Sequence, residues 1–326
     1  MVADDIREVD YCDTSTVVRS THAMGSEITI QVVPGRSPDG DLIEALTEAL
    51  DIFHEVDRHC TRFNPDSSLM RANAAAGSWC EVSQVCFDAL AAAAEAYRAT
   101  EGRFDPRVHD DLVRLGYDRS RRLGPMSDRA EEVLQPRVEL PVWEPEFRAS
   151  TREVRLGPAA IDLGGIGKGL AVRAAAGRLM HLGAGSLIEA GGDCWCEGSA
   201  PDGGSWRLAV EDPHGGALPV AVLTLADLAV ATSSIKVCSW TVGSTQVHHL
   251  IDPRTGQPGG SGLAAVTVIA NDAAVAEVWS KTLFLAGAEA IADEACRRGV
   301  AAIWVESNGR VGFAAEVEPF VLWRAR

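Results

Sequence analysis

The sequence predicts an α+β fold in which helices pack on mainly antiparallel sheets. Stretches with the apolar alternation of β-strands follow one another closely and are separated by turn signals such as Pro34-Gly35 and Asn308-Gly309. Stretches with helical periodicity do not alternate regularly with these strands, as they would in a parallel α/β fold. With 326 residues, 46% of them hydrophobic, the chain is long enough to bury a sizeable core.

The expected elements follow in order along the chain. Apolar residues at helical spacing predict helices over residues 41–60, 85–101, 168–182, 274–286 and 289–298. Asp41 is a residue type that caps a helix start, and Gly102 is a type that ends one. Apolar stretches predict strands over residues 24–33, 187–196, 206–210, 220–225, 247–251 and 264–270, a hairpin leading into a buried strand over 154–163, and a hairpin over 301–313. Residues 124–146 are rich in proline and charge and predict a connection.

The overall charge limits the classes of partner. A net charge of −16 argues against a surface that binds nucleic acid or an anionic membrane. No apolar stretch reaches membrane-spanning length, and residues 1–13 have neither the basic start nor the apolar core of a signal peptide. We therefore expect a cytoplasmic protein with an N-terminal tail over residues 1–20 and one domain over residues 21–326.

One segment concentrates chemically useful groups, His248-His249-Leu250-Ile251-Asp252-Pro253-Arg254-Thr255-Gly256. Pro253 fixes φ at the start of a turn, and Gly256 can take the positive φ that ends it. Such a corner would hold imidazoles, a carboxylate, a guanidinium and a hydroxyl together, and could handle phosphate and protons. An ordinary β-turn, in which Asp252 and Thr255 bond their own backbone, is the alternative.

A second segment, Ile161-Asp162-Leu163-Gly164-Gly165-Ile166-Gly167-Lys168-Gly169-Leu170-Ala171, leads through a glycine-rich turn into a helix. Glycines let backbone amides approach a ligand, and a helix start favours anions. Lys168 adds a charge suited to phosphate. The spacing matches neither a Walker loop nor a dinucleotide fingerprint, so a tight turn with a solvated lysine is the alternative.

Two shorter motifs also stand at expected element ends. Gly102-Arg103-Phe104-Asp105-Pro106 follows a helix and supplies an aromatic ring and a carboxylate, or is a helix C-cap with Phe104 in the core. Ala190-Gly191-Gly192-Asp193 ends a strand and brings its backbone close to another group, or forms a bulge.

In this order, the motifs resemble those of the ApbE-type FAD:protein FMN transferases from residue 24 to about residue 287. The matching segments are Met24-Gly25-Ser26, Thr61 to Asn73, Gly102 to Pro106, Asp162 to Gly169, Ala190 to Asp193, Ala231-Thr232-Ser233 and His249 to Gly256. The resemblance implies an ApbE-like fold that binds FAD. It also implies Mg²⁺-assisted transfer of FMN from FAD to a threonine or serine hydroxyl of a client flavoprotein, with release of AMP.

The resemblance assigns roles to individual residues. Those implied to bind FAD are Met24, Phe63, Arg103, Phe104, Asp105, Gly164, Gly165, Lys168, Ala171, Thr232 and Ile251. The attacking hydroxyl needs a base, which His249 or Asp252 could provide, and Arg254 could offset developing charge. Three functions share such a pocket: a transferase, which we favour, an FAD-binding or carrier protein, and a pyrophosphatase that releases FMN and AMP.

Departures from the family pattern gather at the expected metal site. Family members usually carry Asp-Ala-x-x-Thr, whose carboxylate and hydroxyl ligate the metal, where this chain has Glu277-Val278-Trp279-Ser280-Lys281. Glu277 could still reach a cation. Lys281, four residues later, would more naturally pair with Glu277 and occupy the place of the cation. We therefore expect a weakened metal site.

Overall fold

A computed structural model of the chain describes residues 7–8, 16–35, 39–118, 137 and 140–325. At its centre is a nine-stranded sheet with the order β1-β2-β3-β7-β8-β11-β16-β17-β18. Each neighbouring pair in this sheet is antiparallel. The predicted α+β class with mainly antiparallel sheets is therefore confirmed.

The strands of this large sheet come from both ends and the middle of the chain. They are β1 (Arg7–Glu8), β2 (Val17–Ala23), β3 (Ser26–Pro34), β7 (Gly183–Ala190), β8 (Asp193–Gly198), β11 (Leu228–Ser234), β16 (Leu263–Ala270), β17 (Ala301–Glu306) and β18 (Val311–Phe313). Because β2 begins at Val17, the predicted boundary at residue 20 falls inside a strand of the sheet, and the folded unit starts earlier than predicted.

Four smaller sheets surround the large one. They are formed by β9 (Trp206–Val210), β10 (Ala221–Leu225) and β19 (Val321–Arg324); by β4 (Cys80–Glu81), β5 (Glu146–Arg148) and β6 (Glu153–Arg155); by β12 (Ser239–Val242) and β13 (Thr245–His248); and by β14 (Ile251–Asp252) and β15 (Gln257–Pro258). The predicted hairpin over 154–163 lies earlier, at β5 and β6, and residues 161–163 are buried without forming a strand.

The helices are α1 (Asp39–Cys60), α2 (Ser68–Ala74), α3 (Gln84–Ala99), α4 (His109–Arg114), α6 (Gly167–Leu179), α7 (Ala273–Phe284) and α8 (Ile291–Arg298), with a 3₁₀ helix over Ala315–Phe320. Helix α1 starts at Asp39, so Asp41 lies in its first turn and is not the predicted cap. None of the described helices combines the length and apolarity needed to cross a membrane.

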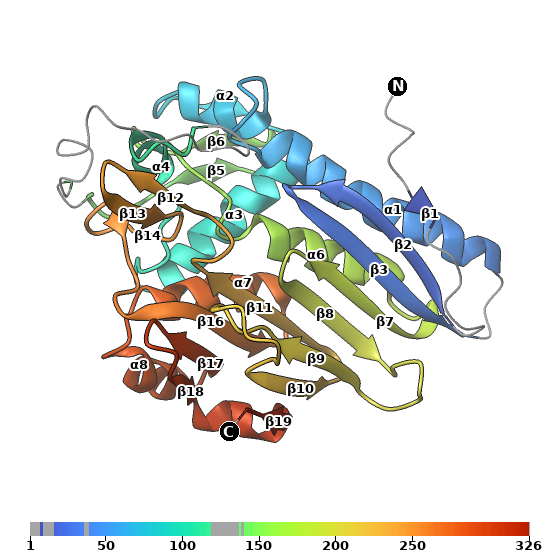
Figure 1. Cartoon of the computed structure of the whole chain (residues 1–326). Helices are drawn as coiled ribbons and strands as arrows, with labels where there is room; N and C mark the ends of the chain where they lie inside the picture. Colours follow the sequence, from blue (N-terminus) through green and yellow to red (C-terminus); the bar gives the residue numbers. More distant parts are fainter. Residues whose placement is uncertain (1–6, 9–15, 36–38, 119–136, 138–139, 326) are drawn as a thin grey trace.

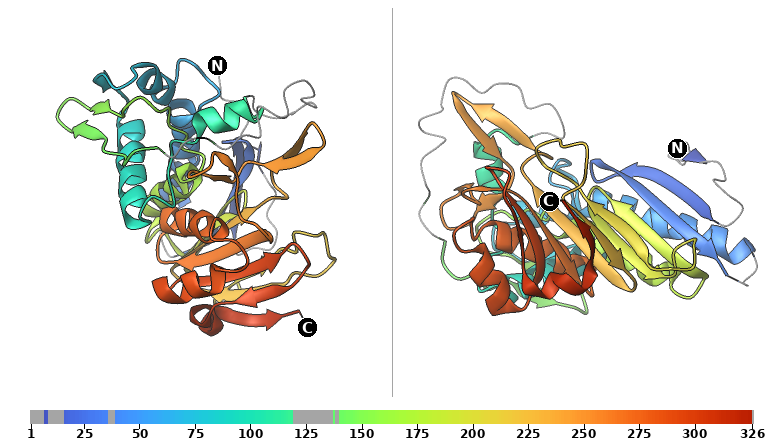
Figure 2. Two further views of the ribbon diagram at one scale, coloured as in Figure 1. Left: turned by 90° about the vertical axis from the view of Figure 1, so that its left-hand side faces the viewer. Right: turned by 60° about the horizontal axis from the view of Figure 1, so that its bottom comes forward.

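Helices cover one face of the large sheet, and the small sheet with β9 and β10 covers the other (Figure 1). Helices α1, α6 and α7 lie along one face (Figure 1), and the turned views show the same layering (Figure 2). The main core forms there, with Phe53, Ile30 and Phe284 fully buried. On the other face, β9 and β10 enclose a second core around Trp206 and Leu223. The loops at one edge of these layers remain open to form the site.

A tight turn separates β7 from β8 at the edge of the sheet. Residues 187–196 form two strands, β7 and β8, because Gly191 (φ 59°) and Gly192 (φ 95°) make a two-residue hairpin turn. The predictions of one continuous strand over residues 187–196, or of a bulge at Gly191 and Gly192, were therefore wrong.

Most of the predicted connection over residues 124–146 lies outside the described residues.

The first turns of α6 and α7 are in direct backbone contact. A Cβ at Gly169 would lie 2.6 Å from the Ala273 carbonyl oxygen and 2.7 Å from the Ala274 Cα. The backbone of Gly169 does not need a positive φ, so it is the space, not the conformation, that requires glycine. This contact fixes the start of α6, and with it the glycine-rich turn, against α7.

Gly169→Ala should therefore lower the free energy of unfolding by about 1–3 kcal/mol, because the added methyl group forces the two helices apart. Gly177→Ala in the same helix is the matched control. Gly177 is exposed with no atom within 4 Å of an added Cβ, so the change should be neutral or stabilise by up to about 1 kcal/mol. Urea unfolding of both variants measures the difference, and equal effects would contradict the packing argument.

Candidate active site

A cavity of about 1530 Å³ opens where the loops at this edge converge. Its wall includes the β2–β3 turn, the segment that follows α1 and the segment that follows α3. It also includes the glycine-rich turn before α6, the β7–β8 turn and residues between Cys238 and Pro253. This volume exceeds that of ordinary small-molecule pockets, so the cavity can accept a ligand larger than a single nucleotide-sized group.

The β2–β3 turn carries a non-glycine residue in a left-handed conformation. Met24 has φ 52° and Gly25 has φ 74°, the pattern of a type I′ hairpin turn. The backbone N–H of Met24 donates to Asp57 Oδ2 at 3.0 Å and so holds the turn against the end of α1. The Met24 Cε lies 3.3 Å from where a Cβ of Gly167 would be, so the side chain reaches the glycine-rich turn.

The glycine-rich turn is fixed by neighbouring segments. Asn73 holds Ile161 through two hydrogen bonds, donating from Nδ2 to the carbonyl at 2.9 Å and accepting from the N–H at 2.8 Å. Asp162 Oδ1 accepts the Gly164 N–H at 2.7 Å. A Cβ at Gly165 would lie 2.9 Å from the Phe104 ring and 3.4 Å from Lys281 Cδ, so this glycine is needed for close packing.

Two aromatic rings of the cavity wall pack against an ion pair. The guanidinium of Arg62 donates to Asp162 Oδ2 at 2.8 Å, and it lies 4.2 Å from the centre of the Phe63 ring and 4.3 Å from that of Tyr117. Asp105, also in the wall, is bound by Arg107 through both of its carboxylate oxygens. Phe63 is exposed and Tyr117 is half-buried, and aromatic rings beside a cation suit the stacking of a flat ring system.

Four charged side chains meet beneath the glycine-rich turn. Lys168 pairs with Asp193, and its Nζ lies 3.9 Å from Glu277 Oε1. Lys281 Nζ donates to Glu277 Oε1 at 3.1 Å, and Glu277 Oε2 accepts the Gly169 N–H at 2.8 Å. The predicted pairing of Glu277 with Lys281 is therefore present. Both carboxylates are buried, whereas both ammonium groups lie in the cavity wall.

Charge pairing outweighs burial at Lys168 and Glu277, whereas burial dominates at Asp193 and raises the pKa of that carboxyl to about 6. Burial favours the uncharged forms, but the carboxylates of Asp193 and Glu277 raise the pKa of Lys168 above its usual value. Burial likewise acts to raise the pKa of Glu277, but the ammonium groups of Lys281 and Lys168 lower it below the usual range. Lys168 and Glu277 are therefore charged at neutral pH.

His249 presents an unprotonated nitrogen in the same wall. Its Nδ1 lies 3.1 Å from the Cys238 carbonyl oxygen, which can only accept, so Nδ1 carries the hydrogen and Nε2 is left with a lone pair. Burial lowers the pKa of His249 to about 4, and the charges of Lys281 and Lys168 act in the same direction. The imidazole is therefore neutral at pH 7 and able to accept a proton.

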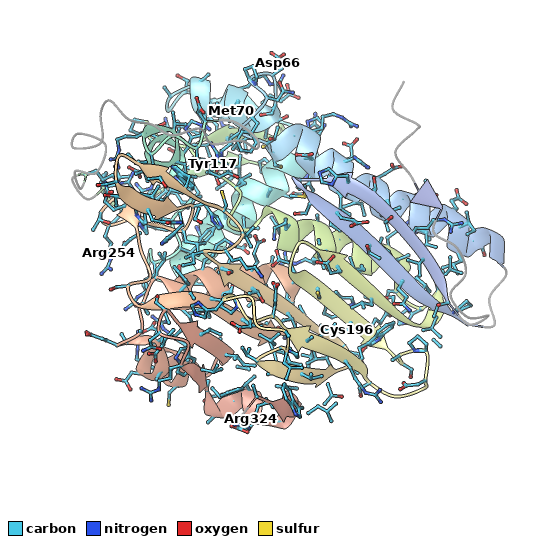
Figure 3. All side chains as sticks on the ribbon, in the orientation of Figure 1. Asp66, Met70, Tyr117, Cys196, Arg254 and Arg324 are labelled. Carbon is cyan, nitrogen blue, oxygen red and sulfur yellow. The ribbon has the colours of Figure 1, made fainter. Side chains whose placement is uncertain are left out.

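Asp252 and Arg254 are used by their own turn. Asp252 Oδ1 accepts the Arg254 N–H at 3.0 Å, and Oδ2 accepts from Arg254 Nη2 at 2.7 Å. Gly256 has the predicted positive φ, 66°. The Arg254 side chain is 66% exposed and lies at the periphery of the molecule (Figure 3). Neither side chain lines the cavity, so the geometry favours His249 over Asp252 as the base and does not support a charge-stabilising position for Arg254.

The structure brings most of the predicted binding residues together. Those that line the cavity are Met24, Phe63, Arg103, Phe104, Asp105, Gly164, Gly165, Lys168, Thr232, His249 and Ile251. Ala171 does not, because it faces the core from the inner side of α6 and is fully buried. Glu277 lies beneath the wall, fully buried. Arg62 and Asp193 were not predicted as site residues, although both lie in motifs that the sequence singles out.

Comparison with known proteins agrees with the family resemblance that the sequence motifs indicate. A model of the ApbE family matches residues 24–304. The chain belongs to the ApbE family. The ApbE protein of Thermotoga maritima has a closely similar structure, with a TM-score of 0.78 and 25% identity over 94% of this chain and 99% of that one.

Relatives named FAD:protein FMN transferase align with most of this ApbE-family chain. That of Chlamydia pneumoniae is 28% identical over 248 residues, 74% of this chain and 76% of its own length. That of Haemophilus influenzae is 26% identical over 285 residues, 84% of this chain and 82% of its own length. The predicted family and fold are confirmed, and the chain is homologous to flavin transferases.

The protonation state of His249 can be tested directly. Its imidazole should titrate near pH 4, because burial disfavours the charged form. The pKa is lowered on folding, so the stability that the neutral form contributes is complete above about pH 6.5 and is lost as the pH falls towards 4. An NMR titration of the histidine ring protons, with His249→Gln to assign the signal, measures this. Titration near pH 6.5 would contradict the buried, neutral imidazole.

Proposed function

We propose that this protein transfers FMN from FAD to a threonine or serine hydroxyl of a client flavoprotein, with release of AMP. The observation that carries the proposal is the neutral His249, with its hydrogen fixed on Nδ1 by Cys238, in the same cavity wall as Lys168 and the glycine-rich turn. A binding protein without chemistry has no need of a base fixed in one tautomer beside a phosphate-binding turn.

The cavity offers matching surfaces for the parts of FAD. Phe63 and Tyr117, with Arg62 between them, supply aromatic faces for the flavin ring. Lys168, at the start of α6, supplies positive charge for the pyrophosphate, and the glycines of the Gly164 to Gly167 turn let the ligand come close to the backbone. The N–H groups of Gly164 and Gly167 are bonded within the turn. Both surfaces line the same cavity, so a single FAD molecule can contact both of them.

The reaction follows from these positions. The hydroxyl oxygen of the client attacks the phosphorus atom on the FMN side of the pyrophosphate, and its proton passes to Nε2 of His249. A new phosphoester bond forms as the bond between this phosphorus and the bridging oxygen breaks, and the bridging oxygen leaves with AMP. Lys168 stabilises the charge that develops on the phosphate oxygens.

Incubation with FAD and a flavoprotein domain that carries a threonine acceptor tests the proposal. Mass spectrometry should show the client domain heavier by one FMN group, with an equal amount of AMP in solution. Free FMN and AMP without a client adduct would instead indicate a pyrophosphatase. Intact FAD with no product would indicate a binding or carrier protein.

His249→Ala should lower the rate of transfer by about 10²-fold or more, because the attacking hydroxyl loses its base. FAD affinity should stay within about tenfold, roughly 1.4 kcal/mol. His248→Ala is the matched control, since the adjacent imidazole accepts the Leu250 N–H at 3.3 Å and does not line the cavity. It should retain most of the activity. Equal losses in the two variants would contradict the assignment of His249.

A further inference from the structure

The residues at the expected magnesium position do not fit a metal ion. Mg²⁺ needs oxygen ligands in an octahedron. The two oxygens of Glu277 are already bound, one to the Gly169 N–H and the other to the Lys281 ammonium. The described part of the chain contains no group of three or more His, Cys, Asp or Glu side chains that could hold a metal. A cation bound at Glu277 would have to displace Lys281.

The distribution of lysine points to the same place. The chain has only three lysines among its 30 lysine and arginine residues, and Lys168, Lys236 and Lys281 all line the cavity. Elsewhere the chain uses arginine for positive charge. An ammonium group is a compact point charge of the kind that binds phosphate. The cavity wall also carries carboxylates, among them Asp105, Asp162 and Glu189, so the position of each lysine, and not the number of lysines, decides where an anion can bind.

Lys281 is held in position to meet that anion. Its Cδ and Cε lie 3.4 and 3.6 Å from where a Cβ of Gly165 would be, so the stem runs directly under the glycine-rich turn. Its side chain is 17% exposed, and its ammonium shares the Glu277 carboxylate with Lys168. An ammonium group carries three donors, and the bond to Glu277 uses one of them.

We propose that Lys281 is a built-in cation that binds the FAD pyrophosphate together with Lys168, so that FAD binds without a metal ion. The inference rests on the proposed function, because it takes FAD as the substrate of this cavity. Glu277 holds Lys281 in place instead of ligating a metal. The charge that a bound cation would supply is thus a permanent part of α7.

Titration of FAD by fluorescence quenching, in EDTA and in excess Mg²⁺, tests this inference. The unmodified protein should bind FAD with the same affinity, within about twofold, in both buffers. Lys281→Thr should weaken binding by about tenfold or more in EDTA, because charge-assisted bonds to the pyrophosphate are lost. Lys281→Arg should recover part of this loss. Lys281→Thr combined with Glu277→Asp should make binding depend on Mg²⁺.

Two controls separate the possible failures. Riboflavin lacks the pyrophosphate, so its binding should be equal in Lys281→Thr and in the unmodified protein. Arg178→Thr removes a cation of α6 that pairs with Glu48 and does not line the cavity, and it should leave FAD binding unchanged. Strong FAD binding that needs Mg²⁺ would overturn the role of Lys281 and leave the transferase in place. Absence of FAD binding in both buffers would overturn the proposed function as well.

A second measurement needs no substitution. An amine-acetylating reagent can modify three lysine side chains, and peptide mass spectrometry can quantify each of them. Saturating FAD in EDTA should protect Lys281 and Lys168, whereas riboflavin, which lacks the pyrophosphate, should not. Equal acetylation of Lys281 with and without FAD would overturn the inference.

Discussion

The buried carboxylate of Glu277 is the interaction on which the site depends. One oxygen accepts the Gly169 N–H in the first turn of α6, and the other accepts from Lys281 one turn further along α7. A negative charge near a helix N-terminus is favourable, and a fully buried carboxylate is tolerable only when it is paired in this way. Glu277 thus fixes α6 to α7 at the point where the glycine-rich turn begins.

This arrangement also sets the electrostatics of the cavity. Glu277 is shared by Lys168 and Lys281, so two ammonium groups are brought close together beneath one turn. Their charges help to keep His249 neutral, the form in which Nε2 can accept a proton. Phosphate binding and proton acceptance therefore follow from one set of contacts. The turn that contains Asp252 contributes to the structure of the site and not to its chemistry, because the Asp252 carboxylate is already bonded to Arg254.

Local signals explain how much could be predicted from the sequence. The long helices and the strands β9, β10 and β16 were predictable because their apolar residues repeat with a clear period. Strand β11 was missed although it lies mid-sheet, because Leu228–Ser234 consists largely of small and hydroxyl residues packed on both faces. The short helices α2 and α4 have too few turns for a periodic signal.

In the site, too, residues with a local sequence signal were predictable and residues without one were not. Residues in turn motifs were predictable because glycine and proline mark where the backbone must come close. Ala171 shares a motif with Lys168, but its side chain is a single methyl group that is fully buried in the core, whereas the long Lys168 side chain reaches the cavity. The roles of Tyr117 and Cys238 depend on segments far apart in the chain, and neither has a local signal. The pairing of Glu277 with Lys281 was predictable because residues four apart on a helix are neighbours.

A double-mutant cycle on Glu277 and Lys281, measured by urea unfolding, tests the central claim most directly. Glu277→Gln and Lys281→Met should each lower the free energy of unfolding by about 3 kcal/mol, because each leaves a charge without its buried partner. The double variant should lose clearly less than the sum of the two, by about 1–3 kcal/mol, since neither ion is then left alone. Strictly additive losses would show that the two side chains do not depend on each other, and would contradict the account.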